Sequence, residues 1–393
     1  MIPKDINIKK DCIFVSIASY RDIVCNQTLK TMFQMASKPE NIYAGICQQN
    51  RPEDEDCVVN FDTKYKQYLN NVRIIRIPEF EAKGPTFARH LCSTLWNGEE
   101  FFFQIDSHSK FVKHWDLKLI KMFRDLKNKG VKKPLISHYP PGSDEYTEDG
   151  SPAVPRMCKS FFNDRGMISF LGAEHTTTNG IAHETPYVAA GMMFSEYTLL
   201  QDVPFDPSLP YLFVGEEILH SIRIYTSGYN IYTPTENIVY HEYTRAGKDK
   251  IWTDNPYYSD VPAFEKTKMY IKLNENKDFN LPHELKNNME KYGLGIVRTL
   301  EDYYNFAGID VLAKTISKNF CRPNNVETGN VKEHCNEPFA NYEEENKENK
   351  KRKCKKNYYT IAIYVVLLLL LLLLLWVIMS KKSKKFKLPR YFK

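Results

Sequence analysis

The sequence lacks the usual marks of several protein classes. Its nine cysteines are scattered and form no C-x-x-C pair, which argues against a zinc ribbon and against a small disulfide scaffold. The first twelve residues contain no apolar core of the length that a secretory signal needs. The formal net charge is only +6, and lysine and arginine crowd into residues 347–356 and 381–393. The rest of the chain is close to neutral, so we expect no nucleic-acid partner.

Three cysteines, Cys12, Cys47 and Cys92, fall inside apolar stretches. Such an environment is typical of cysteines that are buried as free thiols. Because the nine cysteines show no pairing pattern, we expect reduced thiols and a reducing compartment.

One long apolar run lies near the C-terminus. Tyr359–Met379 spans 21 residues and contains an unbroken run of leucines, Leu367–Leu375. At about 1.5 Å per residue this length crosses roughly 30 Å of hydrocarbon. Basic clusters flank both ends, so the positive-inside rule leaves the orientation open. We expect a single C-terminal transmembrane helix over residues 358–380 that anchors the chain to a membrane, with the body of the chain in the cytosol.

Residues 11 to about 130 alternate short apolar segments with helical patterns. Helical spacing appears at residues 29–36, and Pro85 is placed to start a second helix. This alternation predicts an α/β fold with a mainly parallel sheet flanked by helices, whose ligand site lies beyond the carboxyl ends of the strands. The expected strands are Ile13–Ala18, Ile42–Cys47, Val72–Ile77 and Phe101–Ile105.

Composition divides the chain into successive parts. Residues 131–250 mix short strands with loops rich in proline, glycine and threonine, and residues 321–357 are charged and poor in apolar side chains. The second composition is typical of a flexible stalk. The expected parts are a domain at 1–250 with halves 1–130 and 131–250, an extension packed on it at 251–320, a stalk at 321–357, the membrane helix at 358–380 and a basic tail at 381–393.

The sharpest local signal follows the fourth expected strand. Asp106 and His108 stand two residues apart at the end of this strand. If the chain turns there, a carboxylate oxygen and an imidazole nitrogen can face one site, and this pair suits Mn²⁺ and similar ions. A solvated loop carboxylate beside an unrelated histidine would give the same short pattern. A third ligand can come from His241, which ends a short apolar strand.

A second signal is the segment from Gly215 to Gly228. Ile218, Leu219, Ile222 and Tyr225 form a helical apolar stripe, which places Glu216 and Glu217 in the first turn. The helix dipole favours their charge there, and capping alone would explain one of them. Successive helical residues point about 100° apart, so the two glutamates are expected to differ in role.

The order and spacing of these motifs resemble glycosyltransferases of the GT-A fold. The chain is similar to the cytoplasmic hydroxyproline-linked N-acetylglucosaminyltransferases and, more distantly, to the polypeptide N-acetylgalactosaminyltransferases. The resemblance runs through residues 11–250 and is carried by SIASYRD, ICQQN, AKGPTFARHL, FFFQIDSHSKF, VAAGMMFS and GEEILHSIRIYTSGYNIYTP.

The resemblance implies a metal-dependent enzyme that moves a sugar, N-acetylglucosamine first among the candidates, from a UDP-sugar to a hydroxyl acceptor with retention. Hydroxyproline, serine or threonine of a protein, or a glycan, would supply that hydroxyl. The cofactor would be Mn²⁺, with Mg²⁺ as the alternative. Two alternatives stay open: a transferase that uses UDP-Gal, UDP-GalNAc or UDP-Glc, and an inactive membrane-tethered sugar-binding scaffold.

The resemblance also assigns roles to residues. Glu217, rather than Glu216, is the expected catalytic carboxylate toward the acceptor, and Arg89 would stabilise the diphosphate. The metal ligands would be Asp106, His108 and His241. The nucleotide-sugar contacts would come from Ser16, Ala18, Ser19, Arg21, Gln48, Gln49, Asn50, Lys83, Gly84, Arg89 and Asp106.

Overall fold

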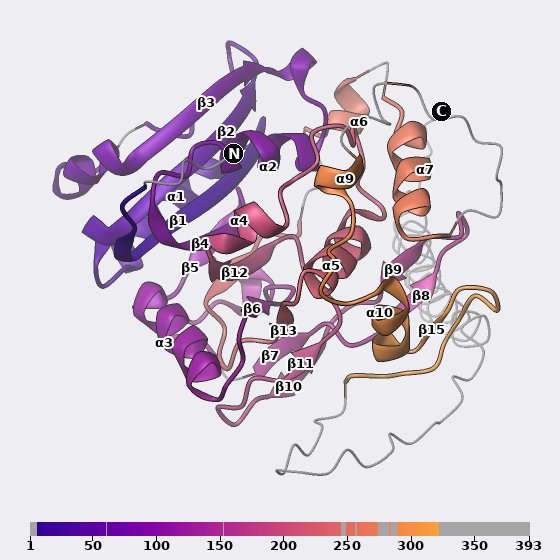
Figure 1. The fold of residues 1–393 in the computed structure, drawn as a ribbon. Helices are drawn as coiled ribbons and strands as arrows, with labels where there is room; N and C mark the ends of the chain where they lie inside the picture. The colour runs from indigo at the N-terminus through magenta and orange to yellow at the C-terminus, as the bar shows by residue number, and fades with distance from the viewer. Residues whose placement is uncertain are drawn as a thin grey trace, which may run out of the picture. The chain divides into compact units, whose positions relative to one another are not determined.

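The computed structural model describes residues 6–321 except 60, 152, 245–248, 256–257, 274–282 and 284–288. The centre of this part is an eight-stranded sheet in the order β11-β13-β6-β12-β4-β1-β2-β3 (Figure 1). Neighbouring strands are parallel except where β12 meets β4 and β6, and where β11 meets β13. The sheet is therefore mixed and mainly parallel, as the sequence predicted.

The four expected N-terminal strands are all present, and each is as long as predicted or longer. They occupy the β3-β2-β1-β4 side of the sheet, while shorter strands from the second half of the domain complete it. The sheet strands are β1 Lys9–Tyr20, β2 Ile42–Asn50, β3 Val72–Pro78, β4 Glu99–Asp106, β6 Pro134–Ser137, β11 Glu184–Thr185, β12 Met192–Glu196 and β13 Asn230–Tyr232.

Helices cover both faces of the sheet. Alternate strand residues point to opposite faces, so Phe101, Phe103 and Ile105 join one core with α1 and α3. Phe102 joins a second core with α4 and α5. The same alternation directs Gln104 and Asp106 toward the face that carries α2 and α5. The helices are α1 Cys25–Met35, α2 Pro85–Ser93, α3 Trp115–Asn128, α4 Thr198–Asp202, α5 Glu216–Thr226, α6 Ile251–Asp254, α7 Val261–Tyr270, α9 Met289–Tyr292 and α10 Leu300–Ala307.

Short two-stranded ladders join loops outside the main sheet. The ladder that matters for the site pairs β5 with β14 in antiparallel fashion and sets His241 opposite Ser109. The ladders are β5 Ser109–Phe111 with β14 Val239–His241, β7 Ala153–Arg156 with β10 Glu174–Thr177, β8 Ser160–Phe162 with β9 Ile168–Phe170, and β15 Ile309–Asp310 with β16 Thr315–Ile316.

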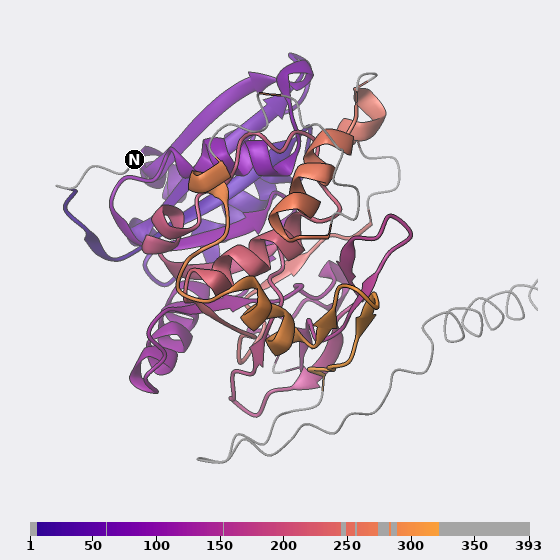
Figure 2. The ribbon, with the colours of Figure 1, turned by 45° about the vertical axis from the view of Figure 1, so that its right-hand side comes forward.

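The apolar stripe of α5 packs as predicted. Ile218, Leu219 and Ile222 are buried in one cluster with Phe264 of α7 and Tyr303 of α10. Figure 2 shows α7 and α10 beside α5. The segment after residue 250 thus covers the outer side of the helix that carries both glutamates.

Two disulfides join distant segments, Cys25–Cys57 and Cys158–Cys321. The cysteine spacing did not predict them, and disulfides are more typical of oxidising compartments than of the reducing one that we expected. Cys321 was also placed in a flexible stalk, whereas its bond to Cys158 makes it part of the folded body. The prediction of buried free thiols is confirmed for Cys12, Cys47 and Cys92.

The predicted membrane helix at 358–380 lies outside the described residues. Within residues 6–321, as far as they are described, no helix is long and apolar enough to cross a membrane.

A glycine sets the position of α2. Gly84, the residue before the helix, has φ +92° and ψ 178°, a conformation that glycine alone adopts readily. A Cβ atom there would lie 2.9 Å from the Cα of Tyr211, whose N–H donates to the carbonyl of Lys83. Gly84 therefore allows the loop before α5 to touch the start of α2, and this close approach brings the two helices together.

Gly84→Ala should destabilise the protein more than Gly130→Ala. Both glycines have positive φ, but a Cβ at Gly130 meets nothing within 4 Å. We expect the free energy of unfolding to fall by on the order of 1–3 kcal/mol more in Gly84→Ala. Urea unfolding of both variants measures the difference, and equal losses would show that contact with Tyr211 does not constrain the fold.

Candidate metal and donor site

The three predicted metal ligands come together at the carboxyl end of β4. Asp106 is the last residue of β4, His108 lies in the turn before β5, and the β5–β14 ladder brings His241 alongside. Asp106 Oδ2 is 3.1 Å from His241 Nε2, and the two imidazole centroids are 4.5 Å apart. One ligand atom from each residue lies within 4.8 Å of the others. An oxygen and two nitrogens at this spacing fit a divalent cation.

Charge and space at Asp106 also suit a cation. Burial would raise the pKa of this carboxyl, but its hydrogen bond to His241, its interaction with His108 and the positive charge of Arg89 hold the pKa well below its usual range. Asp106 is therefore ionised at neutral pH. Gly191, just before β12, leaves room beside it, because a Cβ there would lie 3.1 Å from Asp106 Oδ2.

Arg89 links α2 to this carboxylate. Its side chain is buried, and Nη1 donates to Glu216 Oε1 at 2.8 Å, while Nη2 lies 3.6 Å from Asp106 Oδ1. Burial would lower the pKa of Arg89, but Glu216, Asp106 and Glu217 raise it above its ordinary value. Arg89 thus carries a fixed positive charge next to the candidate metal site, as the sequence predicted.

The two glutamates of α5 differ in surroundings, as the 100° spacing predicted. Glu216 bonds to Arg89, so its carboxylate joins two helices and does not act as a simple helix cap. Glu217 Oε1 accepts from the N–H of Ala190 at 2.8 Å, and Oε2 accepts from the hydroxyl of Tyr139 at 2.5 Å. Burial, together with the charge of Glu216, raises the pKa of Glu217 to about 7. Glu217 therefore keeps its proton to a higher pH than an ordinary glutamate does.

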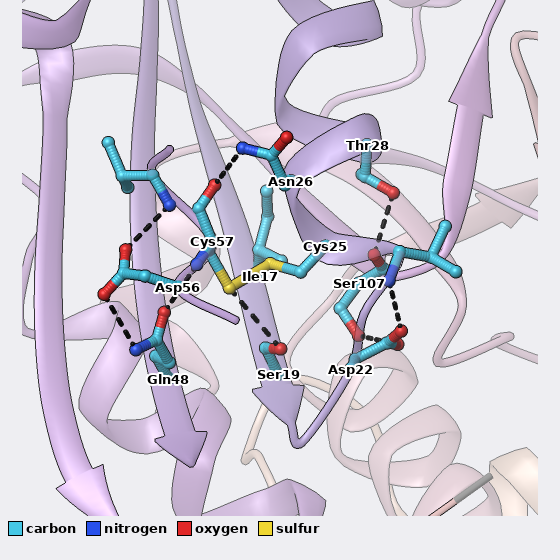
Figure 3. The surroundings of a disulfide bond; sticks show 12 residues. Ile17, Ser19, Asp22, Cys25, Asn26, Thr28, Gln48, Asp56, Cys57 and Ser107 are labelled. Carbon is cyan, nitrogen blue, oxygen red and sulfur yellow. Dashed lines mark hydrogen bonds between the residues drawn. A yellow bond between two sulfur atoms is a disulfide. The ribbon is translucent and has the colours of Figure 1, made fainter. Parts of the chain in front are cut away.

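The predicted nucleotide-sugar contacts on β1 lie on opposite faces of the strand. Ser16 and Ala18 lie in register with Gln104 and Asp106, on the face that α2 covers. Ser19 is fully buried, and its hydroxyl contacts Cys57 Sγ at 3.6 Å (Figure 3).

Arg21 just beyond β1 is held by acidic side chains. Its guanidinium pairs with Asp54, Asp249 and Asp254 at 2.8–2.9 Å. These contacts tie the end of β1 to α6, so Arg21 acts in this structure as a cross-link between segments.

The end of β2 is fixed by contacts and still presents acceptors. Gln48 accepts from the N–H of Cys57 at 2.7 Å and donates to Asp56 at 3.1 Å (Figure 3). Gln49 donates to the carbonyl of Ser19, and Asn50 to that of Glu55. Gln49 Oε1 and Asn50 Oδ1 are buried and have no hydrogen-bond partner within the described part of the chain.

Lys83 is exposed, and its Nζ lies 5.3 Å from the centroid of the Phe87 ring. Its ammonium group therefore remains accessible at the start of α2, next to the backbone contact that Gly84 makes with Tyr211.

Sequence reasoning missed residues that support the site. Asp22 contacts His108. It lies in the motif SIASYRD, to which the resemblance assigned roles only at Ser16, Ala18, Ser19 and Arg21. Ala190 and Gly191 lie in VAAGMMFS, which was recognised as a motif but given no role. Tyr139 stands in a loop with no pattern around it, so only the fold places it against Glu217.

The sequence also matches the profile of a known family along most of its length. Two stretches of the chain, residues 12–69 and 61–313, match the profile of the family described as Glycosyltransferase (GlcNAc). No curated protein sequence matches the chain.

Solved structures of similar shape include GalNAc-T7 with UDP, GalNAc and Mn²⁺, at 12% identity and a TM-score of 0.49 over 77% of this chain and 57% of that one. Residues 1–349 of TarS from S. aureus, in complex with UDP-GlcNAc, match at 13% identity and a TM-score of 0.42 over 72% of this chain and 73% of that one. The profile match covers more than half of the sequence and confirms the resemblance that the motifs indicated: the chain belongs to the Glycosyltransferase (GlcNAc) family and is a glycosyltransferase.

Proposed function

We propose that the protein transfers a sugar, N-acetylglucosamine first among the candidates, from a UDP-sugar to a hydroxyl group, with a divalent metal held by Asp106, His108 and His241. One observation carries the proposal. Asp106 and His108 meet the distant His241 at the carboxyl edge of a mainly parallel sheet, beside the buried charge of Arg89. Ligands of such sheets bind at this edge.

The residues present fit a metal of the Mn²⁺ type, with Mg²⁺ as the alternative. An ionised carboxylate and two imidazoles are ligands that Mn²⁺ accepts. When bound, the metal would neutralise charge on the diphosphate of the donor.

Arg89 would add a second positive group for the diphosphate. A guanidinium binds phosphate oxygens through several N–H groups in a fixed plane. Glu216 holds this plane through its bond to Nη1. We therefore assign Glu216 the role of positioning Arg89.

The uridine would lie at the carboxyl ends of β1 and β2. The unpartnered acceptors of Gln49 and Asn50 support this placement, because a buried acceptor without a donor is costly and the imino N–H of uracil is a donor.

Glu217 would orient the acceptor hydroxyl and accept its hydrogen bond. Its carboxylate is held by Tyr139 and Ala190, whereas that of Glu216 is held by Arg89. A pKa of about 7 places this group near the value that suits proton transfer at neutral pH. Hydroxyproline, serine or threonine of a protein, or a glycan, is the acceptor class that we propose, with retention of configuration.

Chelation should abolish activity, and His241→Ala should weaken metal binding. We expect EDTA to stop hydrolysis and transfer with UDP-GlcNAc, and Mn²⁺ to restore them. Calorimetry with Mn²⁺ should show much weaker binding by His241→Ala, because one of the three ligands is lost. His114→Asn is the matched control, since His114 is exposed and asparagine tolerates its positive φ.

A chelator-insensitive enzyme would contradict the metal assignment. A panel of UDP-GlcNAc, UDP-GalNAc, UDP-Gal and UDP-Glc identifies the donor. Binding of UDP without turnover of any donor would instead favour the inactive sugar-binding scaffold.

Glu217→Gln should keep UDP binding but lower turnover by roughly 10²–10⁴, the usual effect of a positioned acid or base. It should also change how stability depends on pH. Folding raises the pKa of Glu217 from 4.5 to about 7, so the stability linked to this group is present below pH 4.5 and is lost as the pH rises through 7.

We therefore compare the free energy of unfolding of Glu217→Gln with that of the wild type. The difference, variant minus wild type, should be larger at pH 8 than at pH 5 by on the order of 3 kcal/mol. Urea unfolding at both pH values measures this difference. Glu216→Gln is the comparison variant and should instead weaken donor binding, because it releases Arg89. If Glu216→Gln binds donor normally and stops reacting, the two assignments are reversed.

Attachment to a membrane through residues 358–380 is a further part of the proposal, and it rests on the apolar run of the sequence alone. Deleting residues 358–393 should release the protein from the membrane fraction while donor turnover continues. Sedimentation of full-length and shortened protein from cells tests this. Loss of all turnover in a folded, shortened protein would show that the C-terminal segment takes part in the activity.

A further inference from the structure

Asp22 makes a contact that the proposed mechanism has not used. Its side chain is buried, and Oδ2 lies 2.6 Å from His108 Nδ1 and accepts from the hydroxyl of Ser107 at 2.7 Å. Its other oxygen, Oδ1, accepts from the N–H of Val24 at 3.0 Å. Figure 3 shows Asp22 and Ser107 facing each other between the end of β1 and the turn after β4.

This contact determines which nitrogen of the His108 imidazole carries the proton. A neutral histidine carries one proton, and a carboxylate beside Nδ1 keeps that proton on Nδ1. Nε2 then keeps its lone pair, which is the atom that a metal requires. A metal-binding histidine is commonly oriented in this way by a carboxylate on its other nitrogen.

The segment that carries Asp22 is itself anchored to the turn that carries His108. The hydroxyl of Thr28 donates to the carbonyl of Ser107 at 2.8 Å and accepts from the N–H of Ser109 at 2.9 Å. The disulfide between Cys25 and Cys57 fixes the first turn of α1 to the segment beyond β2 (Figure 3). Asp22 and the turn are therefore held at one separation before any ligand binds.

We propose that Asp22 is a positioning residue that holds His108 in its Nδ1–H form, with the lone pair on Nε2, and so sets the affinity of the site for a divalent metal. This inference rests on the proposed metal site. It adds a residue from the first βα turn to a site whose ligands come from β4, the following turn and β14.

A purely structural role for Asp22 makes a different prediction. The bond from Val24 N–H to Oδ1 is a local turn contact, and any side chain that preserves it would then suffice. Asp22→Asn preserves this contact and the volume, but its amide nitrogen would face His108 and donate to Nδ1. The proton of His108 would then move to Nε2, the nitrogen that the metal needs.

The test uses the full-length protein and two readouts. Calorimetry with Mn²⁺ alone should show affinity 10- to 100-fold weaker for Asp22→Asn than for the wild type. NMR of protein labelled with ¹⁵N-histidine, without metal, should report the Nδ1–H form of His108 in the wild type and the Nε2–H form in Asp22→Asn.

Asp116→Asn is the matched control. Asp116 is also buried and accepts from the N–H groups of Ser37 and Lys38 at 2.8 Å. Within the described part of the chain it makes no hydrogen bond to Asp106, His108 or His241. It should lose comparable stability while keeping Mn²⁺ affinity. If Asp22→Asn does not fold, Asp22→Ser provides the second variant, because its hydroxyl can still accept from Val24 but is too short to reach His108.

The outcomes separate the two proposals. Unchanged Mn²⁺ affinity in a folded Asp22 variant, or an unchanged form of His108, would overturn the role of Asp22 and leave the metal site standing. No Mn²⁺ binding by the wild type would overturn the proposed metal site and, with it, the effect of Asp22 on affinity.

Discussion

A carboxylate at the end of a parallel strand, Asp106, is the constraint on which the rest of the site depends. Its partial burial would raise the free energy of its charge, so positive groups must lie close by. Arg89 from α2 supplies a positive charge near one carboxylate oxygen, and His241 from β14 contacts the other. The charge of Asp106 thus joins a helix and a ladder that are far apart in sequence, and the same arrangement offers oxygen and nitrogen ligands to a cation.

The charge of Arg89 needs a further partner, which explains the arrangement of α5. Glu216 supplies it from the first turn of that helix. The close approach of the loop before α5 to the start of α2, permitted by Gly84, makes this pairing possible. The helix then directs Glu217 away from Arg89, toward Tyr139 and Ala190. Burial raises the pKa of both carboxyls, but Arg89 opposes the rise at Glu216, whereas the charge of Glu216 adds to it at Glu217.

The turn between β4 and β5, which carries His108, is held in place by residues just before and within α1. Asp22, just before α1, and Thr28, in its first turn, bond to Ser107 in the turn between β4 and β5. The Cys25–Cys57 disulfide adds a covalent link in the same region. A site for a small cation tolerates little displacement of its ligands, and these contacts fix the turn independently of a ligand.

The sequence by itself predicted the four N-terminal strands, the helix after Pro85 and the helix that carries Glu216 and Glu217. Apolar runs such as Phe101–Ile105 and the stripe on α5 depend on local periodicity, which the tertiary structure did not override. The convergence of Asp106, His108 and His241 was predictable because such residue types at strand ends are informative and their order resembles that of a family.

Only the tertiary structure decided which partner each side chain meets. The bond of Glu216 to Arg89, the contacts of Arg21 with three acidic residues and the approach of Asp22 to His108 join residues 33 or more positions apart. The disulfides belong to the same class, since spacing alone does not specify which cysteines meet. The pattern along the chain sets the elements, whereas their packing places these groups within 3 Å of one another, and local periodicity carries no information about that packing.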